Sequence, residues 1–254
     1  MSWLERRDAV MMSVELVCFH HAGGGSASFH PLRRALADMG ANARIRTVTL
    51  PGRESRRAER RHVDAEGCVA ALADELETQL TGPHVLLGHS MGALLAYAVA
   101  QQRISRGQRP PEAVVVAACR APQRPAPVQD LRLIDDHQLA TQLAAYGGLP
   151  TELLDRPEWL ALLMPTVRDD LRIVQSFRPP DQPPLPCPLH IFGGYRDPLV
   201  PPDALAAWST LSTQPHPVRL FSGGHFLFRA PEPALVARIA SVAADASWRR
   251  SGLR

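Results

Sequence analysis

Short apolar runs alternate with longer amphipathic stretches along most of this chain. Most runs are rich in β-branched residues and end at turn-forming residues, which is typical of buried strands. They occupy residues 14–19, 44–50, 84–87, 113–118, 186–192 and 217–221. Apolar residues recur at helical spacing in residues 26–39, 64–80, 90–102 and 232–247. The pattern therefore predicts strands that alternate with helices.

This order of elements indicates the fold class. Strands that alternate with helices and are joined by short turns form βαβ units, whose strands are parallel. Most of the runs are continuously apolar, as expected for strands that helices cover on both faces. We predict an α/β fold with a mostly parallel central sheet, formed as a single domain by residues 1–254.

Residues 122–184, here called the lid segment, interrupt this alternation. Prolines bound the segment, it contains no strand-like run, and its pattern predicts helices at 134–146, 151–154 and 157–177. A helical insertion between two strands of such a sheet is a candidate lid. Its apolar side chains could line an acyl pocket, but holding the lid helices onto the core is the simpler role for each. They are Leu139, Leu143, Leu153, Leu154, Leu160, Leu163, Met164, Val167 and Leu171.

The composition excludes several classes of protein. An apolar fraction of 45% supports a sizeable core, and a net charge of +3 argues against a dedicated nucleic-acid binder. No apolar run has the ~18–20 residues that a membrane-spanning helix needs. All 28 basic residues are arginine, so lysine chemistry, including a Schiff base or a P-loop, is excluded.

The four cysteines and the N-terminal residues indicate a cytoplasmic location. Cys18, Cys68, Cys119 and Cys187 form no CxxC pair or short metal-ligand spacing, so we expect free thiols. Residues 1–12 carry several charges and no continuous apolar stretch, unlike a secretory signal. Together these features predict a cytoplasmic protein with unpaired cysteines.

The strongest chemical signal is a G-x-S-x-G pattern at residues 88–92. An apolar strand precedes it and an apolar helix follows, which is the context of a nucleophile elbow. There, glycines two residues before and after the serine relieve crowding. We therefore take Ser90 as a candidate nucleophile; the alternative is a chance pentapeptide in a glycine-containing turn.

A serine nucleophile needs a base and a carboxylate that orients the base. Asp197 follows the predicted strand 186–192, and His225 follows the strand 217–221. Both therefore fall at the carboxyl ends of strands, where open α/β sheets place their sites. Asp197 could instead be a turn-forming aspartate before proline, with Asp203 as the fallback acid, and His225 a simple loop histidine.

The reaction also needs backbone donors for a tetrahedral oxyanion. We expect the N–H groups of Met91 and of Ala22, in the glycine-rich loop after the first strand. This loop does not match the dinucleotide fingerprint G-x-G-x-x-G. A metal site at His20 and His21 is disfavoured, because adjacent residues point apart and no acidic or cysteine cluster lies nearby in sequence. We predict neither a metal nor a cofactor.

With these features the chain resembles the type II thioesterases of the α/β-hydrolase superfamily. These are the free-standing editing hydrolases of polyketide and non-ribosomal peptide assembly lines. The similarity covers residues 14–245 and rests on several motifs in order. They are C-F-x-H-A-G-G at 18–24, L-P-G-R at 50–53, G-H-S-M-G at 88–92, Y-G-G-L-P at 146–150, P-T-V-R-D-D at 165–170, G-G-x-x-D-P at 193–198 and G-G-H-F at 223–226.

The resemblance implies an α/β-hydrolase fold and hydrolysis of acyl thioesters on the phosphopantetheine arm of acyl or peptidyl carrier proteins. It implies Ser90 as nucleophile, His225 as base, Asp197 as orienting acid, and Ala22 and Met91 as oxyanion donors. The chain departs from the family at two positions. His20 replaces a proline before H-A-G-G, and Tyr195 stands where an acidic residue is frequent. His20 could alter the shape or the pH response of the oxyanion loop.

The expected partner is a carrier protein, with no nucleic acid and no membrane, and a monomer is the default. Arginines in residues 53–61 could steer an acidic carrier, although a solvated surface loop is at least as good an explanation. Three other functions stay open: a general carboxylesterase or lipase-like hydrolase, a non-catalytic hydrolase-fold binding protein, and an acyltransferase or integrated chain-terminating domain. The complete Ser–Asp–His order argues against the binding protein.

Overall fold

The computed structural model describes residues 14–124, 131 and 133–248. Within these residues one sheet contains seven strands, and every paired strand runs parallel to its neighbour. The order is β2–β1–β3–β4–β5–β6, and β7 also pairs with β5. The strands are β1 Val14–Phe19, β2 Ala43–Thr47, β3 His84–His89, β4 Ala113–Ala117, β5 Leu185–Gly194, β6 Ser212–Pro215 and β7 Arg219–Phe221. The α/β prediction is confirmed.

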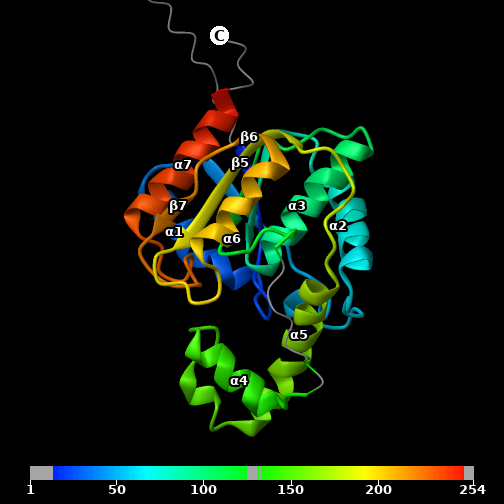
Figure 1. Ribbon diagram of the computed structural model, residues 1–254, viewed down its shortest axis with the longest axis vertical. Helices are drawn as coiled ribbons and strands as arrows, with labels where there is room; N and C mark the ends of the chain where they lie inside the picture. Colours follow the sequence, from blue (N-terminus) through cyan, green and yellow to red (C-terminus); the bar gives the residue numbers. More distant parts are fainter. Residues whose placement is uncertain (1–13, 125–130, 132, 249–254) are drawn as a thin grey trace, which may run out of the picture.

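Helices cover both faces of the sheet (Figure 1). Helices α1 (His30–Asp38) and α7 (Pro233–Trp248) pack together on one face, and α2 (Ala65–Gln79) and α3 (Met91–Ser105) on the other. Successive residues of β3 enter opposite cores: Leu86 joins the α2–α3 core, and Leu87 the α1–α7 core. Two buried faces explain the continuously apolar strands. None of the helices in the described ranges is long and apolar enough to span a membrane.

Some element boundaries differ from the predicted ones. The edge strand β6 has the polar sequence Ser-Thr-Gln-Pro and so gives no hydrophobic signal. The short helix α6 (Pro202–Ala206) and the 3-10 turn Ala207–Leu211 were not predicted either. The predicted helix 26–39 begins as a 3-10 turn, Ser26–Phe29, before α1.

The lid segment contains α4 (Asp136–Ala145), a 3-10 turn (Thr151–Leu153) and α5 (Pro157–Ser176). Helix α4 lies apart from the sheet, at the lower end of Figure 1, and packs against α5. These helices have a small apolar core of their own, to which eight of the nine apolar residues considered above belong, Leu163 being the exception. These eight therefore pack among the lid helices rather than onto the main core, and a role in lining a pocket stays a prediction.

Helix α5 connects this small core to the main one. Its second half carries Ile173, which is buried in the α2–α3 core together with Phe177 just beyond the helix. Pro165 lies inside the helix and cannot donate a backbone hydrogen bond to the preceding turn. Residues on both sides of it pack in the lid core, namely Met164, Val167 and Leu171, and Ile173 is the first buried residue of α5 that packs in the main core.

All four cysteines lie within the described residues; none forms a disulfide, as predicted, and each is buried. Burial raises the pKa of the Cys68 and Cys119 thiols to about 12. Thiols with such raised pKa values stay protonated and are poor nucleophiles. They act as small apolar core residues.

Candidate active site

Ser90 lies at the turn between β3 and α3. Its backbone has φ 54° and ψ −118°, a conformation that a non-glycine residue adopts only under constraint. The constraint comes from two backbone hydrogen bonds: Ser90 N–H donates to the Ala117 carbonyl at 2.9 Å, and Ala93 N–H donates to the Ser90 carbonyl at 2.9 Å. The predicted strand–turn–helix context of Ser90 is therefore present.

The glycines on either side of Ser90 are required by close backbone contacts. A Cβ atom at Gly88 would lie 2.2 Å from the Gly92 carbonyl oxygen. A Cβ atom at Gly92 would lie 2.1 Å from the carbonyl oxygen of Phe19, at the end of β1. Only glycine permits these approaches, which press the start of α3 against the loop that follows β1.

Three side chains from separate strand ends meet at this turn. His225 Nε2 lies 3.0 Å from Ser90 Oγ, and His225 Nδ1 lies 2.9 Å from Asp197 Oδ2. Because a carboxylate only accepts, Nδ1 carries the proton and Nε2 is free to accept the serine hydroxyl. The fallback acid, Asp203, lies in the first turn of α6, and His225 pairs with Asp197 instead.

The Asp197 carboxylate is fully enclosed. Its side chain has no exposed surface, and that of His225 is only 7% exposed. The second oxygen, Oδ1, accepts the N–H groups of Leu199 at 2.8 Å and Val200 at 3.2 Å. These donors satisfy the buried charge and fix the oxygen that faces His225.

The loop that follows β1 lies beside the start of α3. It closes with a hydrogen bond from Gly24 N–H to the His21 carbonyl at 2.9 Å. The contacts of Gly92 with the Phe19 and His20 carbonyls bring the segments that carry Ala22 and Met91 together. His20 is buried, and its Nδ1–H donates to the His21 carbonyl at 2.8 Å.

A cluster of buried and partly buried histidines surrounds the candidate base, and sequence reasoning missed it. His89 Nε2–H donates to the His225 backbone carbonyl at 2.7 Å, and the His89 ring packs edge-on against His21 at 5.1 Å between centroids. Burial lowers the pKa of His21 to about 3 and that of His89 well below its usual value. Both rings are therefore neutral. The only sequence signal was their position inside the G-H-S-M-G and H-A-G-G motifs.

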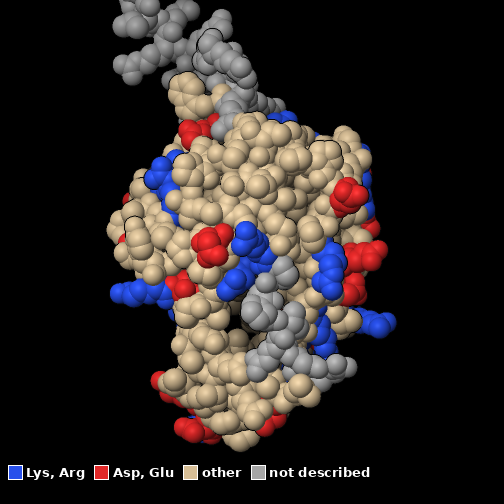
Figure 2. All heavy atoms as spheres, in the orientation of Figure 1, with Lys and Arg blue, Asp and Glu red and all other residues tan. Residues whose placement is uncertain are grey.

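The lid segment contacts the loop that carries His225. The Arg229 guanidinium donates to the carbonyls of Gly147 and Gly148 and lies over the Phe226 ring, 5.1 Å from its centroid. Figure 2 shows a hollow between the body and the part that carries α4. The turn after α4 is therefore attached directly beside the candidate base.

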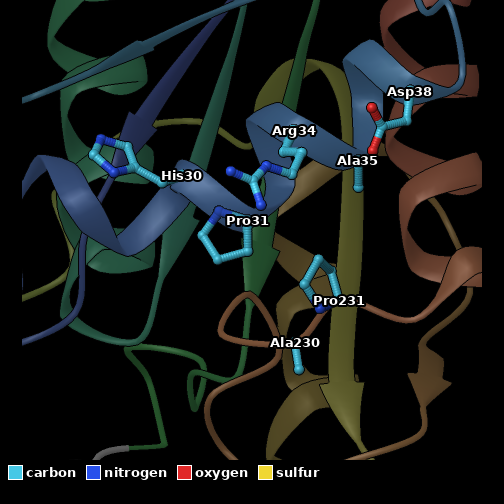
Figure 3. Close-up of a pocket in the computed structure, with 7 residues that line it drawn as sticks. All are labelled: His30, Pro31, Arg34, Ala35, Asp38, Ala230 and Pro231. Atoms are coloured by element: carbon cyan, nitrogen blue, oxygen red, sulfur yellow. The ribbon is translucent and has the colours of Figure 1, made fainter.

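A second surface hollow, of about 480 Å³, contains none of these groups. It lies between α1 and the chain before α7 (Figure 3). Its lining residues are His30, Pro31, Arg34, Ala35, Asp38, Ala230 and Pro231. We assign the candidate site to the Ser90 region, where the candidate nucleophile, base and acid converge.

The parallel sheet, the strained serine turn and the connected Ser–His–Asp side chains define a protein of the α/β-hydrolase class. Residues 14–242 match the family model described as "Thioesterase domain". The chain therefore belongs to the thioesterase family, whose members hydrolyse thioesters.

Named relatives support this assignment. The chain is 30% identical to the gramicidin S biosynthesis protein GrsT of Aneurinibacillus migulanus over 213 residues. This alignment covers 84% of this chain and 82% of GrsT. The structure is similar to RedJ, a thioesterase from the prodiginine pathway of Streptomyces coelicolor, with TM-score 0.82, 32% identity and coverage of 91% and 90%. It is also similar to YbtT, the type II thioesterase of the yersiniabactin pathway, with TM-score 0.82, 28% identity and coverage of 96% and 97%.

Proposed function

We propose that this thioesterase releases acyl groups from the phosphopantetheine arm of carrier proteins, as an editing enzyme of polyketide or non-ribosomal peptide synthesis. The hydrogen-bonded chain from Ser90 through His225 to Asp197 carries the proposal. The relatives place the family in such pathways: GrsT is named for gramicidin S biosynthesis and YbtT for a combined peptide and polyketide pathway. The cytoplasmic location and the monomeric state stay predictions.

The first half of the proposed reaction acylates the serine. His225 Nε2 takes the hydroxyl proton as Ser90 Oγ attacks the thioester carbon. The N–H groups of Ala22 and Met91 stabilise the oxyanion, and the carbon–sulfur bond then breaks. The sulfur leaves with the proton from His225, which yields the free thiol and an acyl-serine. Asp197 holds Nδ1 protonated and stabilises the imidazolium.

The second half releases the acid. Water loses a proton to His225 Nε2 and attacks the acyl-serine carbonyl, again against the two backbone donors. When this intermediate collapses, the carbon–oxygen bond to Ser90 breaks and His225 returns the proton to the serine. The buried, neutral His89 supports this cycle, because its hydrogen bond to the His225 carbonyl fixes the backbone of the base.

The arginine-rich stretch 53–61 divides into two groups in the structure. Arg56 pairs with Glu59 and Glu75, while Arg53 and Arg61 pair with acids of α5. Arg57 and Arg60 are exposed. Of the stretch, we therefore propose these two as the groups that steer an acidic carrier protein.

Charge reversal tests this steering. Arg57→Glu with Arg60→Glu should lower kcat/KM for a carrier-bound acyl group about tenfold at low salt, and leave a small thioester unaffected. The matched control reverses Arg33 and Arg34, which are exposed on α1. An equal loss on both substrates, or in both double variants, would contradict the docking role.

Comparison of the hydrolysis of thioester and oxyester substrates tests whether the protein is a thioesterase. With matched acyl chains, kcat/KM should favour the thioester, and Ser90→Ala should lower kcat by about 10⁶-fold if the three side chains act as a unit. Faster turnover of the oxyester would favour a general carboxylesterase. Serine-independent binding without turnover would favour a non-catalytic protein.

A further inference from the structure

We propose that Arg53 and Asp170 form a positioning pair that fixes the loop carrying Ala22 for oxyanion binding. The proposal rests on the function proposed above, since it concerns how the Ala22 N–H is held. Asp170, on α5, accepts the Gly23 N–H at 2.7 Å, and Arg53 Nη1 donates to the Gly24 carbonyl at 2.9 Å. The two residues after Ala22 are thus each held by one member of the pair.

The two side chains also hold each other. Arg53 Nη1 and Nη2 donate to the two oxygens of Asp170 at 2.8 and 2.7 Å, a bidentate geometry. The pair is enclosed: the Arg53 side chain is 9% exposed and that of Asp170 is 1% exposed. Removal of one partner leaves the other charge buried and uncompensated. The loop contacts of both residues therefore depend on an intact pair.

Further contacts hold the same loop from both sides. Gly23 has φ +75°, and a Cβ atom there would lie 2.8 Å from Cγ2 of Val167, one turn before Asp170 on α5. On the other side, Glu54 accepts the Ser26 N–H at 2.8 Å, with its own backbone at φ 47°. A non-glycine residue keeps this conformation only where its surroundings over-determine it. The L-P-G-R and P-T-V-R-D-D motifs thus meet at the H-A-G-G loop.

Asp170 accepts hydrogen bonds from Gly23 of this loop and from Arg53, so we infer that the carboxylate acts through the backbone of Gly23. Oxyanion donors are effective when they are preorganised, and a displacement of about 1 Å can cost ~100-fold in rate. The adjacent Asp169 provides a matched control. It pairs with Arg61 and Arg172, each at 2.6 Å, on the same turn of α5.

Four proteins test the pair: wild type, Asp170→Asn, Arg53→Lys and Asp169→Asn. The readouts are kcat and KM on a small acyl thioester and the dissociation constants of two ligands. An alkyl boronic acid bonds to Ser90 Oγ and places a boronate oxygen where the oxyanion would form. The corresponding alkyl thioether fills the same pocket but has no carbonyl. Circular dichroism and thermal unfolding establish that each variant is folded.

We expect Asp170→Asn to lower kcat by about 10- to 100-fold with little change in KM. It should weaken boronate binding by a similar factor and leave thioether binding unchanged. Arg53→Lys should act in the same direction, because an ammonium cannot reproduce the guanidinium fork. Asp169→Asn should match wild type in all four readouts.

Three results would overturn the pair's role. They are wild-type kcat and boronate affinity in folded Asp170→Asn, a rise in KM without loss of kcat, or an equal loss in Asp169→Asn. If Asp170→Asn does not fold, the kcat, KM and boronate affinity of Arg53→Lys test the role of the pair by the same criteria. Absence of thioester hydrolysis by wild type would count against the proposed function instead, and boronate affinity would still compare the variants.

Discussion

At the scale of the residue, the site depends on two glycines, because a Cβ atom at either position would collide with neighbouring backbone. Ser90 projects from a strained turn, and Gly88 and Gly92 leave no room there for a methyl group. The motif at residues 88–92 therefore supplies the serine hydroxyl and also allows β3, α3 and the end of β1 to pack closely. The same packing brings the Met91 and Ala22 segments together.

We predict that Gly92→Ala destabilises the protein by about 3 kcal/mol, because the new Cβ would meet backbone atoms that cannot move aside without disturbing β1. Urea unfolding and soluble yield measure the effect. Gly82→Ala is the control, since a Cβ at Gly82 would meet nothing within 4 Å. Equal stability of the two variants would refute the crowding argument.

At the scale of the element, α5 joins the lid segment to the body. Its apolar residues from Leu160 to Leu171 pack in the lid core, and Ile173, near the end of the helix, packs in the main core. A second attachment is the hydrogen bonding of Arg229 to the Gly147 and Gly148 carbonyls. The lid segment is therefore attached to the body both through α5 and through Arg229.

Loss of the second attachment should loosen α4. In Arg229→Ala we expect faster amide hydrogen exchange in peptides that cover α4 and residues 146–149, while β3 exchanges as in wild type. Arg34→Ala, on exposed α1, serves as the control. Unchanged exchange in α4 would show that Arg229 does not hold the lid.

At the scale of the whole molecule, buried neutral histidines make stability depend on pH. Burial lowers the pKa of His84 to about 4 and that of His21 to about 3. The unfolded chain binds protons at these positions below a pH of about 6.5, whereas the folded chain does not. The unfolding free energy is therefore highest above this pH and falls as the pH decreases toward 4.

His84→Gln should flatten this dependence. A neutral buried histidine costs about 2 kcal/mol at pH 5 relative to pH 8, and the variant removes that difference. Urea unfolding at pH 8, 6 and 5 measures the slope, with His137→Gln, at an exposed position of α4, as the control. Slopes that match wild type in both variants would exclude His84 as a source of the pH dependence.

The sequence predicted the elements that carry a hydrophobic signal and the three side chains that meet at the candidate site. Strand β6 was missed because an edge strand of Ser-Thr-Gln-Pro buries little apolar surface. Ser90, Asp197 and His225 could be placed because each follows a recognisable strand. The Arg53–Asp170 pair could not, since its members are 117 positions apart and meet only through the fold. The same holds for Arg229 and its lid contacts.

The most direct test of the central claim is release of a short acyl group from a phosphopantetheinylated carrier protein. Wild type and Ser90→Ala are compared side by side, and free acid and free carrier thiol are quantified. We expect rapid, stoichiometric release of both products by wild type, and release at the uncatalysed rate with Ser90→Ala. Release that persists in the serine variant, or no release from any acyl carrier by wild type, would contradict it.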